Sequence, residues 1–122
     1  MKKRLLILLC SLICHIICLS QVIAPPGADS MSCEDYSGWM TQYYNERLNL
    51  NDWQHVQVYE IILEEKRELA AKMLKTTPAD KPLLLKRYYL SLDGRLGSIL
   101  TSDQYQLYQH LNTVKIKTVE VQ

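Results

Sequence analysis

Apolar side chains recur every three or four residues along most of the chain, which is the period of an amphipathic α-helix. The pattern predicts helices over residues 34–47, 52–75 and 82–99, and a fourth that begins at Ser102. A turn with two prolines, residues 76–82, separates the second helix from the third. The alternating apolar pattern of strands is missing from these segments. We therefore expect an all-α fold, a small helical hairpin or bundle of about four helices.

Each predicted helix has an apolar stripe that we expect to face the core. In the second helix the stripe is Val56, Tyr59, Leu63, Ala70 and Met73, broadened by Ile62 and Leu69. The stripe of the first helix is Tyr36, Met40, Tyr43, Tyr44 and Leu48. That of the third helix is Leu85, Tyr88 or Tyr89, Leu92, Leu96 and Ile99. That of the fourth helix is Tyr105, Tyr108 and Leu111. Gly38 weakens the first helix, and Gly94 and Gly97 weaken the end of the third.

The N-terminal residues have the pattern of a secretory signal peptide. Three bases at positions 2–4 precede an apolar stretch of about 15 residues, shorter than the roughly 20 residues that cross a membrane as a helix. Cleavage after Ser20 is favoured over retention of the segment as an uncleaved anchor. Only an uncleaved signal is expected to attach this protein to a membrane. Lipid attachment at Cys10, Cys14 or Cys18 is disfavoured because the preceding residues are not small. We expect export to the periplasm of a Gram-negative bacterium.

The chain is thus predicted to comprise a signal peptide at residues 1–20, a flexible leader at 21–32, a helical domain at 33–114 and a frayed tail at 115–122. Loss of the signal leaves eleven bases against thirteen acids, a net charge of −2. A nucleic-acid partner is not expected, because such proteins carry a basic patch. Cys33 is then the single cysteine, and a free thiol or a disulfide between two chains are both open.

Residues suited to catalysis or metal binding are sparse in the sequence. His55 and His110 are isolated from each other and from other metal ligands. Cys33 is followed by two acids, which disfavour a reactive thiolate. Phosphate-binding loops and serine-nucleophile motifs are missing. We therefore expect a protein that is not an enzyme, with no catalytic residue, metal or cofactor.

Two similar segments lie fifty positions apart: LNDWQ at residues 50–54 and LTSDQ at residues 100–104. In each, the second residue is a good helix N-cap, and the glutamine three residues later can close a capping box. The leucine before the second cap can form a hydrophobic staple with Tyr105. Two capping boxes alone indicate only that two helices begin here. The predicted capping residues are Leu50, Asn51, Gln54, Leu100, Thr101 and Gln104.

Together with the signal peptide and the helical domain, the two segments resemble the LTxxQ family of small periplasmic stress proteins, the Spy and CpxP type. The resemblance covers about residues 34–112. The second segment, within ILTSDQYQLYQHL, matches the motif fully, and the first, within LNLNDWQHVQVY, has Asn51 in place of threonine. The resemblance implies a bent helical hairpin, often a cradle-shaped antiparallel homodimer, in which the motif residues orient the helix starts.

The resemblance also implies a chaperone-like or stress-response protein whose partners are protein clients or envelope proteins. Two alternatives stay open: a metal-responsive sensor or sequestering protein, and a structural accessory subunit of an envelope complex. The chain departs from the family in its mildly acidic charge, since Spy-type proteins bind clients through a basic concave face. It also lacks the histidine-rich or cysteine-rich segments of the metal-binding members.

The sequence contains eight tyrosines and two tryptophans, more than a small domain is expected to bury. Tyrosine and tryptophan are enriched at protein interfaces because they are large, stiff and amphipathic. Two interpretations stay open. The aromatic residues form a contact surface for a partner, or they are simply divided between the core and scattered surface positions. The candidate contact residues are Tyr43, Tyr44, Trp53, Tyr88, Tyr89, Tyr105 and Tyr108.

Overall fold

The structure is a computed structural model that describes the backbone of residues 23–121 and the side chains of residues 23–112. This part of the chain contains four α-helices and no strand, which confirms the predicted all-α class. The elements are the short 3-10 helix η1 (Ala28–Ser30), α2 (Cys33–Leu48), α3 (Asp52–Met73), α4 (Lys81–Ile99) and α5 (Ser102–Val121). Among these helices, none has the length and apolar character needed to cross a membrane. The predicted signal peptide lies outside the described residues.

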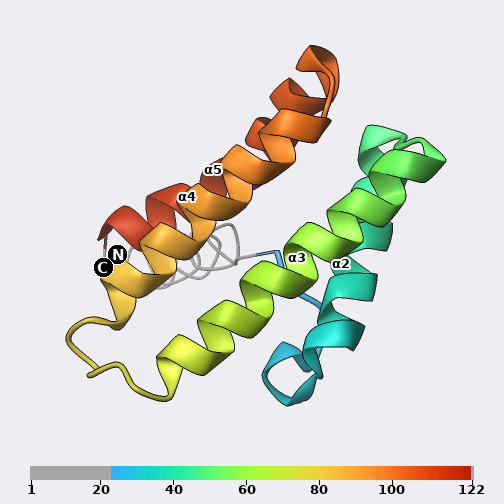
Figure 1. Cartoon of the computed structure of the whole chain (residues 1–122). Coiled ribbons are helices and arrows are strands. Elements are labelled where there is room, and N and C mark those ends of the chain that lie inside the picture. The colour runs from blue at the N-terminus through green and yellow to red at the C-terminus, as the bar shows by residue number, and fades with distance from the viewer. Residues whose placement is uncertain (1–22, 122) are drawn as a thin grey trace, which may run out of the picture.

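The helices form two antiparallel hairpins, α2 with α3 and α4 with α5 (Figure 1). The turns inside the two hairpins lie at one end of the molecule, and the α3–α4 connection lies at the other. Helix α3 packs against both α2 and α4, while α5 contacts α4 and, less extensively, α2. The long α3 helix therefore joins the two hairpins along their length.

Local capping explains where α2 begins and ends. The Ser32 hydroxyl accepts a hydrogen bond from the backbone N–H of Asp35 at 3.0 Å, which makes Ser32 the N-cap. At the other end Asn49 adopts a left-handed conformation with φ of 53°, and its N–H bonds to the carbonyl of Asn45. Asparagine tolerates this conformation better than most residues, so the chain can reverse into α3 within three residues.

The buried face of α3 differs from the predicted stripe. The inward positions are Val58, Ile61, Ile62, Glu65 and Leu69, whereas Val56 and Ala70 are exposed. The prediction was right for Ile62 and Leu69 and wrong for Val56 and Ala70. It failed there because two polar residues, at positions 54 and 65, lie on the buried face and interrupt its apolar pattern. Both are hydrogen-bonded in the structure, so their burial does not leave polar atoms unpaired.

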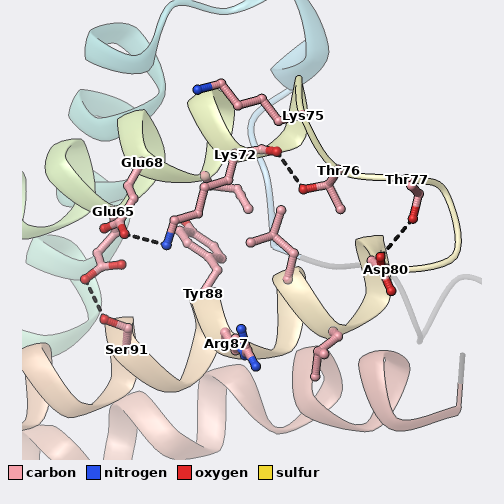
Figure 2. Close-up of a pocket in the computed structure, with 13 residues that line it drawn as sticks. Glu65, Glu68, Lys72, Lys75, Thr76, Thr77, Asp80, Arg87, Tyr88 and Ser91 are labelled. Atoms are coloured by element: carbon pink, nitrogen blue, oxygen red, sulfur yellow. Dashed lines mark hydrogen bonds and ion pairs between the residues drawn. The ribbon is translucent and has the colours of Figure 1, made fainter.

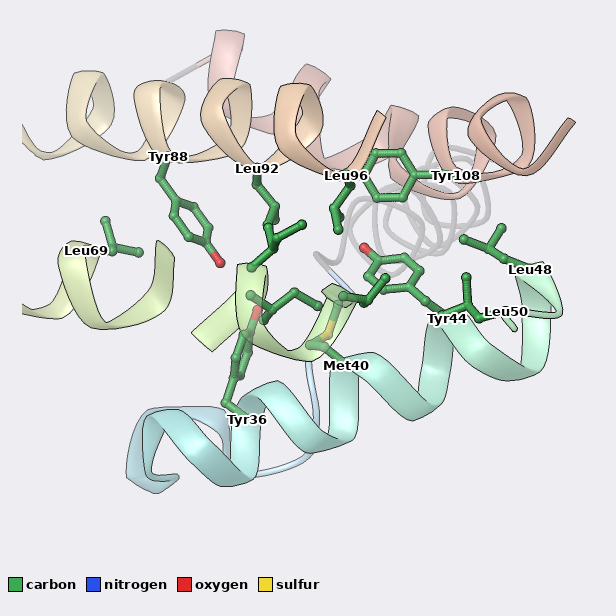
Figure 3. Close-up of a cluster of buried hydrophobic side chains, with 13 residues drawn as sticks. Tyr36, Met40, Tyr44, Leu48, Leu50, Leu69, Tyr88, Leu92, Leu96 and Tyr108 are labelled. Carbon is green, nitrogen blue, oxygen red and sulfur yellow. The ribbon is translucent and has the colours of Figure 1, made fainter. Parts of the chain in front are cut away.

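A single hydrophobic core lies between the two hairpins (Figure 3). The stripes predicted for α2 and α4 contribute most of it, and α5 contributes Tyr108. The buried apolar residues are Tyr36, Met40, Tyr44, Leu48, Leu50, Val58, Ile61, Ile62, Leu69, Tyr88, Leu92, Leu96 and Tyr108.

The two ends of the described chain differ from simple flexible segments. Ile23, Ala28 and Met31 of the predicted leader pack against the core, and η1 forms within it. Apolar side chains thus hold part of this proline-containing stretch against the domain. Helix α5 continues to Val121, so its backbone is helical across most of the segment predicted to be a frayed tail.

The glycines of α4 provide a matched pair for a stability test. A methyl group at Gly94 would meet no atom within 4 Å, whereas one at Gly97 would lie 3.0 Å from Cε2 of Tyr105. We expect Gly94→Ala to raise the free energy of unfolding by about 0.5–1 kcal/mol, because alanine loses less backbone entropy in a helix. We expect Gly97→Ala to be about 1–3 kcal/mol less favourable than Gly94→Ala, because the Tyr105 ring must move. Urea denaturation of both variants measures these changes, and equal effects would contradict the close α4–α5 approach.

Candidate functional site

The LNDWQ segment forms a complete capping box at the start of α3. The Asn51 side chain accepts a hydrogen bond from the backbone N–H of Gln54 at 2.7 Å. The Gln54 side-chain oxygen accepts one from the backbone N–H of Asn51 at 3.0 Å. Leu50, just before the cap, is buried in the core. Asn51 therefore fills the role of the threonine that the second segment has.

The LTSDQ segment does the same at the start of α5. The Thr101 hydroxyl accepts from the backbone N–H of Gln104 at 3.2 Å, and the Gln104 side chain accepts from the backbone N–H of Thr101 at 2.9 Å. Leu100 and Tyr105 both pack against the core in part. Each of the two segments thus starts a helix in the predicted way.

The structure also brings the two capping boxes together, which the sequence did not predict. The Gln54 amide nitrogen donates to the Gln104 amide oxygen at 2.7 Å, and the Gln104 nitrogen donates back to the Gln54 oxygen at 3.1 Å. Each nitrogen also donates to the turn before the other box. Gln54 reaches the carbonyl of Ile99 at 3.0 Å, and Gln104 reaches the carbonyls of Leu48 and Asn49 at 3.2 and 3.4 Å.

This arrangement, which we call the glutamine clasp, consists of Gln54, Gln104 and their capping partners. In each glutamine the oxygen accepts two hydrogen bonds, and the nitrogen donates both to the other glutamine and to a backbone carbonyl. An isolated capping box accepts glutamate or glutamine at this position. Glutamate has no donor when ionised, so it could close the box but not the clasp. The clasp therefore joins the turns of the two hairpins and explains why both segments end in glutamine.

The candidate aromatic contact residues divide between core and surface. Tyr44, Tyr88 and Tyr108 are buried, so their prediction as contact residues was wrong. They are inward because each lies on the face of its helix that meets the other hairpin (Figure 3). Trp53 is 58% exposed. Tyr43, Tyr89 and Tyr105 are half-buried.

The buried tyrosines keep partners for their hydroxyl groups. The Tyr44 hydroxyl donates to the Asn112 side chain at 3.1 Å, and the Tyr108 hydroxyl donates to Asp93. The rings of Tyr44 and Tyr108 lie 5.4 Å apart between α2 and α5. These contacts let the domain bury phenol groups without leaving their oxygens unpaired.

Burial should make the domain sensitive to alkaline pH. Removal from water raises the pKa of Tyr44, Tyr88 and Tyr108 above the ordinary value, and raises that of Tyr89 to about 12. Above pH 10 the unfolded chain releases these protons while the folded chain retains them, so stability must fall as the pH rises. We expect a loss of about 1.4 kcal/mol per pH unit for each such tyrosine.

Absorbance of tyrosinate and the circular dichroism signal, recorded together during an alkaline titration, check this expectation. Ionisation of the buried tyrosines should coincide with loss of helix. In Tyr88→Phe the free energy of unfolding should fall less steeply with pH, by about 1.4 kcal/mol per pH unit, because one fewer proton is released on unfolding. Complete ionisation with the helices intact would contradict the burial of these hydroxyl groups.

Charged side chains join α3 to its neighbours. Glu65, only 6% exposed, accepts hydrogen bonds from the Ser91 hydroxyl at 2.6 Å and from Arg95 at 3.2 Å. Arg95 also pairs with Glu64 at 2.6 Å. On the other side of α3, Arg67 forms an ion pair with Glu34 of α2. The hydrogen bonds of the buried Glu65 carboxylate therefore come from α4, and Glu65 also lines a groove between α3 and α4.

A groove of about 630 Å³ lies between the end of α3 and the first half of α4 (Figure 2). Its apolar residues include Leu69, Leu84 and the ring of Tyr88. Charged side chains from both helices and from the α3–α4 connection surround them. The volume lies within the range of ligand-binding pockets. The groove lies at the end of the hairpins opposite the glutamine clasp.

The described part of the chain contains no group of three or more histidine, cysteine, aspartate or glutamate side chains placed to hold a metal ion. His110 is exposed, and His55 and Cys33 are half-buried. Comparisons with protein-family models, curated proteins and solved structures found no match.

Proposed function

We propose that this protein is an exported, non-enzymatic protein-binding domain with a chaperone-like or stress-response role in the periplasm. The observation that carries the proposal is the groove between α3 and α4, which combines an apolar floor with a charged rim. Surfaces of this kind suit protein segments that carry both apolar and charged side chains. The LTxxQ resemblance supports the same chaperone-like function, and the predicted signal peptide supports the periplasmic localisation.

Exposed apolar side chains support binding of protein as well. Leu83, at the groove, is 52% exposed, and Trp53 and Val56 lie one helical turn apart near the start of α3. Exposed apolar surface next to a groove favours binding there. Leu83 belongs to the groove, whereas Trp53 and Val56 lie outside its lining. The exposed large apolar residues are Trp53, Val56, Leu74, Leu83, Leu90 and Leu107.

The proposal is tested by the ability of the purified exported protein to suppress aggregation of an unfolding client, followed by light scattering. We expect suppression at a near-stoichiometric ratio. Leu83→Ser should weaken it several-fold, because it removes an apolar side chain at the groove. Leu107→Ser, which changes an equally exposed leucine of α5 outside the groove, is the matched control and should have little effect. Absence of suppression by the unaltered protein at several-fold excess would contradict the proposal.

Export is tested separately by cell fractionation and N-terminal sequencing. We expect the protein in the periplasmic fraction, with Gln21 as its first residue. Recovery of the full-length chain in the membrane fraction would instead support an uncleaved anchor.

A further inference from the structure

The charges around the α3–α4 groove are unevenly compensated. Glu68 pairs with Lys72 at 2.7 Å, and Glu65 is held by Ser91 and Arg95. Both glutamates therefore have cationic partners within the domain. Asp80, in the connection, accepts a hydrogen bond from the Thr77 hydroxyl at 2.9 Å. It is the one acid of the groove without a cationic partner among the described residues.

Two bases of the groove have no acidic partner within the described part of the chain. Lys75 lies just after the end of α3, and Arg87 lies on α4. Figure 2 shows them on different sides of the groove, with Lys72 and Tyr88 between them. The lining carries as many acids (Glu65, Glu68 and Asp80) as bases (Lys72, Lys75 and Arg87), so the groove is neutral as a whole. Lys75 and Arg87 are nevertheless the two bases of the lining that form no ion pair with the described residues, and their charges are available to a ligand.

The floor between these two bases is apolar. Leu69 and Tyr88 are buried, and Leu84 is half-buried beside them. An apolar side chain placed over this floor would remove further apolar surface from water. Acidic groups on either side of that side chain would then come close to Lys75 and Arg87. An attraction of this kind fixes the orientation of a ligand as well as adding to its affinity.

We propose that the α3–α4 groove binds a peptide segment in which large apolar residues are flanked on both sides by aspartate or glutamate. This inference rests on the proposed function and names the class of protein segment that the groove selects. A peptide is favoured because the groove is open along two helices and has charge on both sides of an apolar strip, which matches side chains spaced along a chain. The hydroxyls of Thr76 and Thr77 lie at the same groove and can accept hydrogen bonds from peptide N–H groups.

The test uses a fluorescein-labelled peptide in which two leucines are flanked on each side by two aspartates. Its binding to the full exported protein is measured by fluorescence anisotropy. We expect Lys75→Glu combined with Arg87→Glu to weaken binding at least about tenfold, because two attractions become repulsions. The matched control is Lys81→Glu combined with Lys86→Glu, which makes the same charge change on exposed bases of α4 outside the groove. The control should weaken binding less than about twofold.

Peptides with asparagine or lysine in place of aspartate complete the design. We expect both to bind at least about tenfold more weakly than the aspartate peptide. Equal binding of all three peptides, or equal effects of the two double variants, would overturn the proposal. Circular dichroism of each variant shows that the helices remain folded. The aggregation assay on the same variants separates this inference from the proposed function. If the unaltered protein suppresses aggregation but does not prefer the acidic peptide, only this inference is overturned. If the unaltered protein does not suppress aggregation, the proposed function is overturned.

Discussion

Tyr108→Ala should lower the free energy of unfolding by about 3–5 kcal/mol, the usual cost of removing a buried aromatic side chain. Tyr108 is 2% exposed, its ring lies between those of Tyr44 and Tyr105, and its hydroxyl bonds to Asp93. The substitution opens a cavity between α5 and the rest of the core. Denaturant unfolding followed by circular dichroism measures the change. Because small domains are stabilised by only about 5–15 kcal/mol, the variant should be close to unfolding at 37 °C.

Two further substitutions decide whether Tyr108 acts in the core or in contacts with partners. Tyr108→Phe keeps the ring and should cost only about 1 kcal/mol, the net contribution of one hydrogen bond. Trp53→Ala removes an exposed aromatic ring and should change stability by less than about 0.5 kcal/mol. If Tyr108→Ala left stability unchanged and reduced client binding instead, the placement of Tyr108 in the core would be wrong.

The fold class followed from the sequence because helix period and helix capping are local properties. All four helices begin within a few residues of their predicted starts, and the first three also end near their predicted ends, whereas α5 continues through most of the predicted tail. The stripes of α2 and α4 point inward. The face of α3 could not be predicted in the same way. Gln54 and Glu65 look like surface residues in the sequence, and only their partners in α5 and α4 explain their burial. Pairing across hairpins depends on tertiary packing, which the local pattern does not contain.

The candidate site shows the same division between local and distant information. The two capping boxes were predictable, since each lies within five consecutive residues. The contact between them was not, although the shared glutamine was a usable signal: a capping box alone does not require glutamine at both positions. The groove depends on side chains from α3, α4 and their connection. Its unequal charge compensation becomes visible only when the ion pairs are known.

Gln54→Glu should lower the free energy of unfolding by about 2–4 kcal/mol, although a glutamate can still close the capping box. The side chain of Gln54 is almost fully buried, and its nitrogen donates to Gln104 and to the carbonyl of Ile99. An ionised carboxylate has no donor, so it would face two acceptor oxygens without a hydrogen bond to either. Gln57→Glu is the matched control on the same helix. Gln57 is half-buried and outside the clasp, and we expect a change below about 0.5 kcal/mol.

A double-mutant cycle isolates the contribution of the glutamine clasp. Gln54→Ala and Gln104→Ala each remove one capping interaction and also leave the other glutamine without its amide partner. The second substitution should therefore cost less when the first is already present, with an interaction energy of about 1–2 kcal/mol. Denaturant unfolding of the two single variants and the double variant supplies the three values that the cycle needs. Additivity within about 0.5 kcal/mol would mean that the two boxes act independently. The recurrence of the motif would then reflect two separate helix starts, and the hairpins would be joined by the core, by the α3–α4 ion pairs and by the hydrogen bonds of Tyr44 and Ser91.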